Sequence, residues 1–552
     1  MRIRRLLTLA VVMLTLGLAW VLGGCTAFGP DPGEQPSGGP TVNGDVGAPE
    51  TTLSIVAGSE QQSVLTEIVL PWCRAQGYSC NWRLLGSVDQ ARLLQSGGYD
   101  NDAFWFASSV FSQMGNTSGA LRDSEPMFLT PIVFAARPAV LTRLGLGDQS
   151  TAEQVMAATE SGKARVWATN PTQSNSGATV LFSFLNIVAG NPPGQALTHD
   201  QLNSTEVVDG MRRFFAAIDR TPPSTGTMTS MCVAAPDECE AMFTYEDLVI
   251  EKNAELAAAG QEPLHVVYPR GALGISDAPL GFVDHGQEGA DAKYRIFTEL
   301  KSYLTTDPAA LTQLLAMGRR PAAGVGLAVA DPDPAVFNPD WGIQADIAEQ
   351  GVTFPAADVI TEALDHYHTA FRRPADIYYC LDGSGSMGGN GGWSGVQSAA
   401  TALFDPEEAA RNLLQTAPDD RTTVAVFNDR VSGGPWRVDG NADADLSDLE
   451  GRIRAHSPDG GTDMYVCLDQ ALDSFAGTDR KRLIVVMSDG QSSPSGSSAM
   501  LAALRQAQVP VIAIAFGDVD PTQLRDLADA SGGAYVENSN LVAALREAAG
   551  YK

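Results

Sequence analysis

A short turn that follows the apolar run ADIYYCL carries oxygen-bearing side chains at alternate positions. Asp382, Ser384 and Ser386 spell the pattern D-x-S-x-S, and carboxylate and hydroxyl oxygens are the ligands that hard divalent cations prefer. The glycines of the same turn have the G-x-G-x-x-G spacing of a dinucleotide-binding loop, which holds phosphate through backbone N–H groups. The turn therefore predicts either a metal site or a phosphate site.

The surrounding sequence favours the metal. A dinucleotide loop needs a helix that opens at its third glycine, and a second strand with an acidic residue soon after. Here the glycine-rich segment GGNGGWSG begins at Gly388, and the next apolar strand begins near Arg421. Two further strand-end or helix-start positions supply oxygen ligands: Thr462 in GGTDMY and Asp489 in VVMSDG. At one edge of one sheet, these side chains would suit Mg²⁺ or Mn²⁺.

These segments resemble the metal-binding loops of the von Willebrand factor A domain. CLDGSGSM, GGTDMYVCL and IVVMSDG match the three loops, and the similarity covers about residues 374–549. Residues 388–405 depart from the family, whose members usually enter the first helix sooner, and this concerns the rim of the site. The resemblance implies coordination, direct or through water, by Ser384, Ser386 and Thr462, and ordered waters held by Asp382 and Asp489.

Such a ligand set has a functional consequence. Because both carboxylates mostly hold waters, the charge of the ion is incompletely neutralised, and an open position would attract a carboxylate from a partner protein. We therefore expect metal-dependent protein binding rather than catalysis. The six histidines stand in no recognisable catalytic arrangement, and neither serine has a base nearby in the sequence.

Alternating apolar runs and helical segments must position these residues. ADIYYCL, TTVAVFN, KRLIVVMS and VPVIAIAFG read as parallel strands buried on both faces, with helices predicted over 406–417, 463–475, 498–507 and 521–530. This pattern predicts a doubly wound, Rossmann-like α/β domain over residues 374–552, with its ligand site beyond the carboxyl ends of the strands.

Residues 51–370 also alternate strand-like and helix-like segments, which predicts a second α/β domain. Three openings from strand to helix carry hydroxyl groups: Ser59, Ser108 with its neighbour Ser109, and the segment NPTQSNSG that contains Ser176 and Gly177. One such opening is ordinary N-capping. Three together favour a cleft for a small polar solute, because helix N-termini offer free N–H groups.

This domain resembles the type II bacterial solute-binding proteins. The segments that carry the resemblance are TNPTQSNSGATVLFSFL, AMFTYEDLVIEKN, HVVYPRGALGISDAP and LLAMGRRPA. It implies two α/β lobes joined by crossing strands, with the ligand held between them. The candidate cleft residues by resemblance are Ser59, Ser108, Ser176, Gly177 and Tyr245.

The N-terminus predicts export and lipid anchoring. Three arginines precede an apolar run that ends in LGGC, which is typical of a signal peptide over residues 1–24. The sequence before Cys25 resembles a bacterial lipobox, so we expect a lipid on that cysteine and an extracytoplasmic location at the cell membrane. The alternative is an uncleaved membrane anchor. Residues 25–50 are rich in Pro and Gly and predict a flexible tether.

The remaining cysteines and the net charge fit an exported protein. The pairs Cys73–Cys80 and Cys232–Cys239 close short loops, which predicts disulfides in an oxidising compartment. Spacing leaves open whether Cys380 and Cys467 are bonded. The chain has 36 basic and 65 acidic residues, and no basic cluster outside the signal, so nucleic acid is a poor partner.

The sequence thus predicts an envelope binding protein with a solute cleft and a metal-dependent site for a protein partner. Two other functions compete with it. One is the receptor of an ABC importer, in which the C-terminal domain serves for docking. The other is an envelope hydrolase, which the absence of a catalytic arrangement disfavours.

Overall fold

The computed structural model describes residues 42–322, 327–493, 495–517, 519–537 and 541–550. The predicted signal peptide, Cys25 and most of the predicted tether lie outside these residues. Across the described ranges, no helix combines the length and the apolar character that a bilayer crossing requires. The folded part of the chain begins before residue 51, because Asn43 and Gly44 form a short strand that pairs with the strand containing Trp82. A two-residue strand has no hydrophobic pattern, so the sequence does not signal it.

The first lobe is built on a six-stranded sheet in which the first long strand is central. Strand β2 is parallel to both β3 and β4. Its side chains alternate between two apolar clusters, with Leu53 and Ile55 on one face and Val56 on the other. The strands in sheet order are β1 (Asn43–Gly44), β3 (Ser79–Leu84), β2 (Thr52–Ala57), β4 (Ala103–Trp105), β12 (Pro279–Val283) and β5 (Leu121–Pro126). The helices are η2 (Ser59–Gln61), α2 (Gln62–Val64), η3 (Leu65–Val69), α3 (Leu70–Gln76), α4 (Ser87–Ser96), α5 (Ser109–Gly115), α13 (Ala290–Thr306) and α14 (Pro308–Ala316).

The second lobe has its own mixed sheet. The strands in order are β10 (His265–Val267), β6 (Phe128–Ala136), β9 (Ala241–Tyr245), β7 (Val166–Trp167) and β8 (Ile218–Arg220), and β11 (Gly274–Ser276) and β13 (Arg320–Pro321) also pair with β6. The helices are α6 (Pro138–Leu144), α7 (Ala152–Glu160), α8 (Asn175–Val188), α9 (His199–Leu202), α10 (Thr205–Ala216), α11 (Thr225–Ala234) and α12 (Glu246–Ala258).

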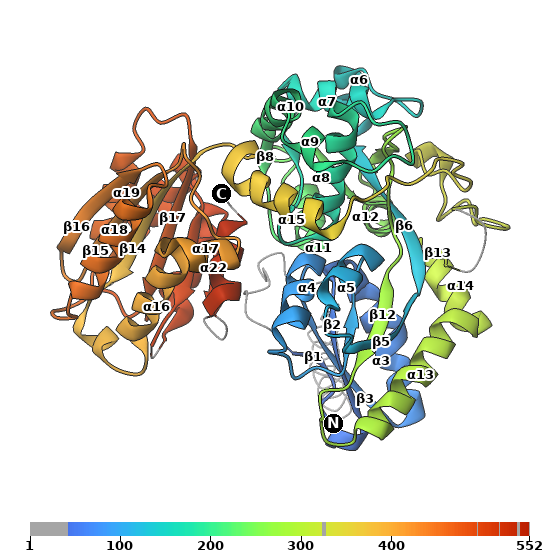
Figure 1. Ribbon diagram of the computed structural model, residues 1–552, viewed down its shortest axis with the longest axis horizontal. Coiled ribbons are helices and arrows are strands. Elements are labelled where there is room, and N and C mark those ends of the chain that lie inside the picture. The colour runs from blue at the N-terminus through green and yellow to red at the C-terminus, as the bar shows by residue number, and fades with distance from the viewer. Residues whose placement is uncertain (1–41, 323–326, 494, 518, 538–540, 551–552) are drawn as a thin grey trace, which may run out of the picture. The chain divides into compact units, whose positions relative to one another are not determined.

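Strand β6 links the cores of the two lobes (Figure 1). Near its start, Phe128 packs on Trp105 of the first lobe, with ring centroids 6.1 Å apart. Near its end, Phe134 packs on Phe243 of the second lobe at 5.1 Å. One strand thus belongs to both hydrophobic cores, which confirms the predicted two-lobed architecture with a crossing strand.

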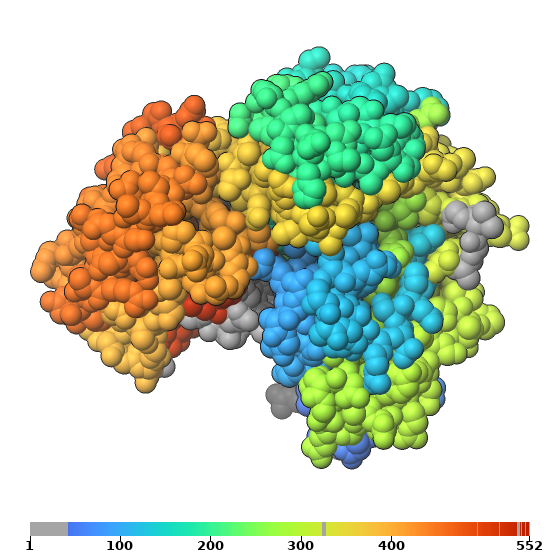
Figure 2. All heavy atoms as spheres, in the orientation of Figure 1, coloured from blue at the N-terminus to red at the C-terminus, as the bar shows by residue number. Residues whose placement is uncertain are grey.

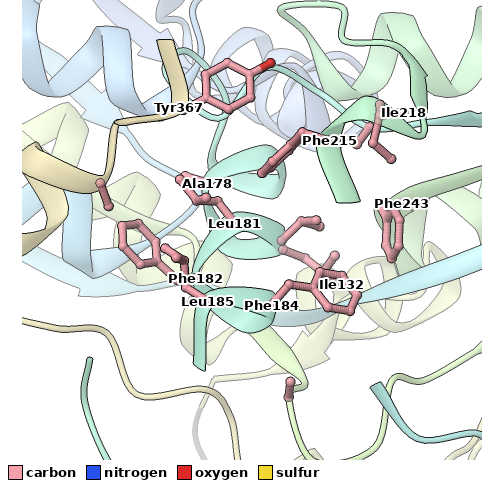
Figure 3. Packing of buried hydrophobic residues seen from close by; sticks show 14 of the residues in the cluster. Ile132, Ala178, Leu181, Phe182, Phe184, Leu185, Phe215, Ile218, Phe243 and Tyr367 are labelled. Atoms are coloured by element: carbon pink, nitrogen blue, oxygen red, sulfur yellow. The ribbon is translucent and has the colours of Figure 1, made fainter. Parts of the chain in front are cut away.

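Helix α8 forms the centre of the second lobe and is apolar over most of its surface. Figure 3 shows Leu181 and Phe184 of α8 among the packed apolar side chains, together with Phe243 of β9. The ring centroids of Phe184 and Phe214 lie 4.4 Å apart. Complete burial of one such side chain stabilises the fold by roughly 1.5–3 kcal/mol. The helix therefore holds its first turn, which carries Ser176, in a fixed place.

The segment after the second lobe packs against both lobes. It contains η4 (Pro339–Trp341), α15 (Ala357–His366) and η5 (Tyr367–Phe371). Phe354 contacts Phe111 of the first lobe and Phe182 of the second, with ring centroids 6.4 and 5.3 Å apart. In Figure 2 the yellow atoms of this segment abut the blue and cyan atoms of the first lobe. The segment thus helps to hold the lobes together.

The C-terminal sheet has the predicted doubly wound form. Strand β14 is central, and its side chains alternate between two apolar clusters that contain Ile377 and Tyr378 respectively. The strands in order are β16 (Val431–Asp439), β15 (Arg421–Phe427), β14 (Ala375–Asp382), β17 (Lys481–Ser488), β18 (Val511–Ala515) and β19 (Ala534–Glu537), and β16 alone pairs in antiparallel sense. The helices are η6 (Gly385–Gly388), α16 (Gly392–Phe404), α17 (Pro406–Arg411), α18 (Asp443–Ala455), α19 (Met464–Ser474), α20 (Ser497–Ala507), α21 (Pro521–Ser531) and α22 (Leu541–Ala549).

Some elements of this domain differ from the sequence-based expectation. The helix predicted over 406–417 ends at Arg411, and Leu413 beyond it has a left-handed φ of 50°. Strand β16 was not predicted, because this edge strand is polar and contains Gly and Pro. The first helix, α16, begins at Gly392, within the glycine-rich segment GGNGGWSG.

Both predicted disulfides are present, and so is the third pairing, which the sequence left open. Cys73–Cys80 and Cys232–Cys239 close short loops, with Cα atoms 6.1 and 5.0 Å apart. Cys380–Cys467 joins residues 87 positions apart, with a Cα separation of 5.9 Å. This last bond links strand β14 to helix α19, an arrangement that the spacing could not settle.

Candidate functional site

The five predicted metal ligands come from three segments at the carboxyl edge of the C-terminal sheet. Asp382 is the last residue of β14, and Asp489 follows the last residue of β17. These strands are parallel neighbours, with Leu381 opposite Met487. Thr462 lies in the turn before α19, and Gly385 N donates a hydrogen bond of 3.1 Å to Gly460 O of that turn. The fold therefore brings the three predicted loops together.

Hydrogen bonds hold the first loop around the Asp382 carboxylate. One oxygen accepts from the backbone N–H of Ser384 at 2.9 Å, and the other accepts from the Ser488 hydroxyl at 2.5 Å. The hydroxyls of Ser384 and Ser386 lie 3.0 Å apart. The sequence analysis missed Ser488, although it directly precedes Asp489 in the motif MSDG.

The turn that contains Thr462 is tied to the segment after β17. The carbonyl oxygen of Thr462 accepts a hydrogen bond from Ser493 N at 3.0 Å, and the Ser492 hydroxyl accepts one from Met464 N at 2.9 Å. Thr462 is half-buried and Ser386 is exposed, whereas Ser384 is buried. The site thus combines buried and solvent-accessible oxygen atoms.

Two buried carboxylates lie at this site without a basic partner. Asp382 and Asp489 are 0% and 1% exposed. Burial raises the pKa of Asp382, the charge of Asp489 raises it further, and the hydrogen bonds from Ser488 and Ser384 oppose both effects. In the described part of this sheet, the buried ion pairs lie elsewhere, at Arg372–Asp420 and Arg421–Asp376. Uncompensated buried charge is costly, so a divalent cation fits the site.

The donor set is dominated by hydroxyls rather than by strong metal ligands. Within the described ranges, no group of three or more His, Cys, Asp or Glu side chains is arranged to hold a metal ion. Two carboxylates and three hydroxyls suit a hard cation that keeps several waters. The set does not suit zinc, which prefers thiolate and imidazole ligands.

Most candidate cleft residues lie where the two lobes meet. Ser59 Oγ of the first lobe accepts a hydrogen bond of 3.0 Å from Gly226 N of the second. Ser176 Oγ lies 2.7 Å from the hydroxyls of both Thr169 and Thr225. Tyr245 OH accepts from Asn175 Nδ2 at 2.9 Å. The lobes are closed, and the hydroxyls of Ser176 and its neighbours satisfy one another.

The other two candidates have structural roles. Ser108 caps the short helix α5 by accepting from Val110 N at 3.3 Å. A Cβ atom at Gly177 would lie 2.2 Å from Thr169 O, so only glycine allows this close approach of the backbone. Ordinary N-capping thus accounts for Ser108, and close packing accounts for Gly177.

A buried group of charged residues beside these hydroxyls was missed in the sequence. Glu60 follows Ser59, Asp247 lies in the first turn of α12, and both are buried. Arg319 forms ion pairs with Asp247 at 3.2 Å and with Glu251. Burial raises the pKa of Glu60 and that of Asp247 to about 7 each. The sequence signals are weak, because Glu60 and Asp247 stand at helix starts, where acidic residues are ordinary, and Arg319 follows the end of α14.

Helix α22 near the C-terminus contacts the loop that precedes α8. Arg546 is buried and pairs with Asp89 at 2.5 Å. Its backbone oxygen accepts from Gln173 Nε2 at 2.6 Å, and its guanidinium donates to Thr172 O. The loop that opens the central helix of the second lobe is therefore held by a residue near the C-terminus.

Known proteins resemble the two parts of the chain. Residues 376–548 match the family model of the von Willebrand factor type A domain. No curated protein matches the sequence. The solved periplasmic binding protein AfuA from Actinobacillus pleuropneumoniae, with fructose 6-phosphate bound, is 12% identical, with 57% of this chain and 97% of that chain covered and a TM-score of 0.43.

Two other solved structures are similar at the same low identity. The ferric binding protein from Campylobacter jejuni is 14% identical, with 57% of this chain and 98% of that chain covered and a TM-score of 0.40. The protein BatB from Bacteroides thetaiotaomicron is 16% identical, with 32% of this chain and 97% of that chain covered and a TM-score of 0.26. The motifs, the sheet topology and the family match agree, and the chain carries a von Willebrand factor type A domain after a two-lobed α/β domain.

Proposed function

We propose that this chain is a lipoprotein of the cell envelope with two binding functions. The cleft of its N-terminal part binds a small polar solute, and its C-terminal domain binds a protein partner at a Mg²⁺- or Mn²⁺-dependent site. The observation that carries the proposal is the pair of buried, unpaired carboxylates of Asp382 and Asp489 beside the hydroxyls of Ser384 and Ser386. We expect no catalytic activity.

The partner site follows from the chemistry of the donor set. Ser384, Ser386 and Thr462 are neutral, and Asp382 already accepts two hydrogen bonds inside the protein. A divalent cation held there would supply positive charge that the protein neutralises only in part. A carboxylate on a partner protein is the natural group to complete it.

The export part of the proposal is supported by the disulfides and by the N-terminal motif. Three disulfides are expected in an oxidising compartment rather than in the cytosol. The lipid would be carried by Cys25, the last residue of the LGGC motif. The protein would then stand on the outer face of the cell membrane.

A second candidate function is the receptor of an ABC importer. The two lobes touch directly through Ser59 and Gly226, as in a clamp that closes on a ligand. In that function the C-terminal domain would dock the receptor to other envelope proteins. Genes for a permease next to this one would favour it.

Calorimetric titration with Mg²⁺ and Mn²⁺ tests the metal site. We expect one weak site in the wild type, and at least about tenfold lower affinity in Asp382→Ala, because residues that orient metal ligands typically contribute this much. Asp469→Ala is the matched control, since Asp469 is an exposed acid on α19 of the same domain. Metal and an acidic partner should strengthen each other's binding by the same factor.

The outcomes separate the alternatives. Equal metal affinity in the wild type and in Asp382→Ala would show that the aspartate and the serines only shape a turn. Metal binding by the wild type that is lost in Asp469→Ala would place the ion elsewhere in the domain. Circular dichroism of each variant shows whether the fold is retained.

A further inference from the structure

The inference concerns the chemical class of the solute in the cleft, and it rests on the proposed solute-binding function. It starts from Glu60, which lies in the first turn after β2 and is 5% exposed. Its neighbour Ser59 bonds to Gly226 of the second lobe, so Glu60 lies where the lobes meet. A Cβ atom at Gly58 would lie 2.1 Å from Glu60 Oε1, which shows that the carboxylate folds over this glycine.

Glu60 presents an acceptor that the protein does not use. Its Oε1 atom is buried and accepts no hydrogen bond from any described residue, and the same holds for Oε1 of Gln61. Buried polar atoms without partners are rare, and each one calls for an explanation such as an absent ligand. An ionised carboxylate can only accept hydrogen bonds, so the missing group is a donor.

The charged groups that face Glu60 make this requirement stronger. Burial raises the pKa of Glu60 most, Asp247 from the second lobe adds to this with a second negative charge, and hydrogen bonds from the Glu60 backbone and the Gln61 side chain oppose both. The negative charge of Glu60 in turn contributes to the raised pKa of Tyr245. The cluster therefore has two acids and a phenol from two lobes.

The one basic group that acts on Glu60 is already engaged. Arg319 pairs with Asp247 and Glu251, and it donates to the backbone oxygens of Glu60 at 2.8 Å and Met317 at 2.7 Å. It also donates to the Ser63 hydroxyl at 3.1 Å. Its Nη1 and Nη2 atoms donate to these groups, its Nε lies 3.2 Å from Asp247 Oδ2, and none of the three donates to Oε1 of Glu60.

We infer that the cleft takes a small organic cation, a solute with a protonated amino group whose N–H donors bind Glu60 Oε1 between the lobes. An oxyanion is disfavoured, because it would meet two carboxylates and bring further acceptors. The neighbouring hydroxyls of Ser176, Thr169 and Thr225 bond to one another and add no cation.

The test compares solutes of one length and different charge on the full chain. Putrescine, 1,4-butanediol and succinate share a four-carbon backbone and are a cation, a neutral molecule and an anion. Methylammonium, guanidinium, choline and glucosamine extend the cation set. We expect cations to raise the thermal midpoint, because a ligand that binds only the folded state stabilises it, and succinate to leave it unchanged.

Glu60→Gln should lower the affinity for the best cation by at least about tenfold, because a hydrogen bond between charged groups is lost. Glu67→Gln is the matched control, since Glu67 is an exposed acid of the same helical segment. In the wild type, affinity for the cation should fall about tenfold from pH 8 to pH 6, as Glu60 takes up a proton. This arm needs no variant and holds even where Glu60→Gln fails to fold.

Each result decides between the two ideas. If succinate or butanediol stabilised the protein and none of the cations did, the inference would be overturned, whereas the proposed solute binding would stand. No stabilisation by any compound would overturn both. Equal affinity of a cation for the wild type and Glu60→Gln, or affinity that does not change with pH, would place the cation elsewhere and overturn the inference.

Discussion

At the scale of single residues, burial decides which side chains carry function. Asp382 is the last residue of β14, and Glu60 lies in the short helix η2 just after β2, so both carboxylates stand near the carboxyl end of a strand that has parallel neighbours. Both are buried without a direct basic partner, and in both cases burial raises the pKa of the carboxyl group. Proteins rarely keep such groups, because an unpaired buried charge is costly. Each therefore marks a position where a cation outside the chain is expected.

Glu60 predicts how the stability of the ligand-free protein depends on pH. Its pKa rises from 4.5 to about 7 on folding, so between these values the folded state holds more protons than the unfolded state. Stability should therefore be greatest at low pH and fall as the pH rises through about 7. For Glu60 alone the loss is on the order of 3 kcal/mol.

Thermal unfolding of the full chain between about pH 5 and about pH 7.5 measures this dependence. Glu60→Gln should flatten the decline and be more stable than the wild type at the upper end. Glu67→Gln should follow the wild type. Parallel curves for all three proteins would show that Glu60 is not buried as an acid in solution.

At the scale of elements, the disulfide Cys380–Cys467 connects two of the segments that carry the proposed metal ligands. Cys380 lies two residues before Asp382 on β14, and Cys467 lies in the first turns of α19, after Thr462. The bond thus fixes the distance between two of the three loops. A cross-link over 87 positions also constrains the unfolded chain.

Replacement of both cysteines by alanine should have two effects. Stability should fall by about 4.6 kcal/mol according to the chain-entropy model. Affinity for Mg²⁺ should fall as well, because the loops are no longer held in register. The variant with Cys73 and Cys80 replaced is the control, since that pair lies in the first lobe. Urea unfolding and metal titration of both variants give the answer, and equal metal affinity in the two would contradict the link.

At the scale of the whole molecule, Arg546 joins residues that are far apart in the sequence. Its guanidinium pairs with Asp89 and donates to Asn412 O at 2.6 Å and to Thr172 O. Burial raises the pKa of Asp89, and the charge of Arg546 opposes this. The loop before α8 is therefore stabilised by α22.

Arg546→Met should destabilise the protein by about 3 kcal/mol, because it removes the ion-pair partner of Asp89, whose side chain is largely buried. The double variant with Asp89→Asn should recover part of the loss. Arg505→Met, at an exposed arginine of α20, should change little. Chemical unfolding compares the four proteins, and equal stability of Arg546→Met and Arg505→Met would show that this contact does not form in solution.

The sequence alone predicted the three loops of the candidate metal site and the two α/β domains. Asp382 and Asp489 were predicted because carboxyl ends of parallel strands meet at one sheet edge, and Thr462 because it stands in a glycine-rich turn before a helix. The buried strands were identified because their apolar runs are continuous. These are local properties, and the topology and the family match agree with them.

The tertiary structure alone decided what lies between distant segments. It shows that Cys380 and Cys467 are bonded and that the Ser488 hydroxyl donates a hydrogen bond to Asp382. It also shows that Ser108 caps helix α5. It also gathered Glu60, Asp247 and Arg319 from three separate parts of the chain. Each of these depends on burial and on contacts between residues far apart in the sequence. A local sequence pattern predicts neither burial nor such contacts, because the same residue types are also common at exposed positions.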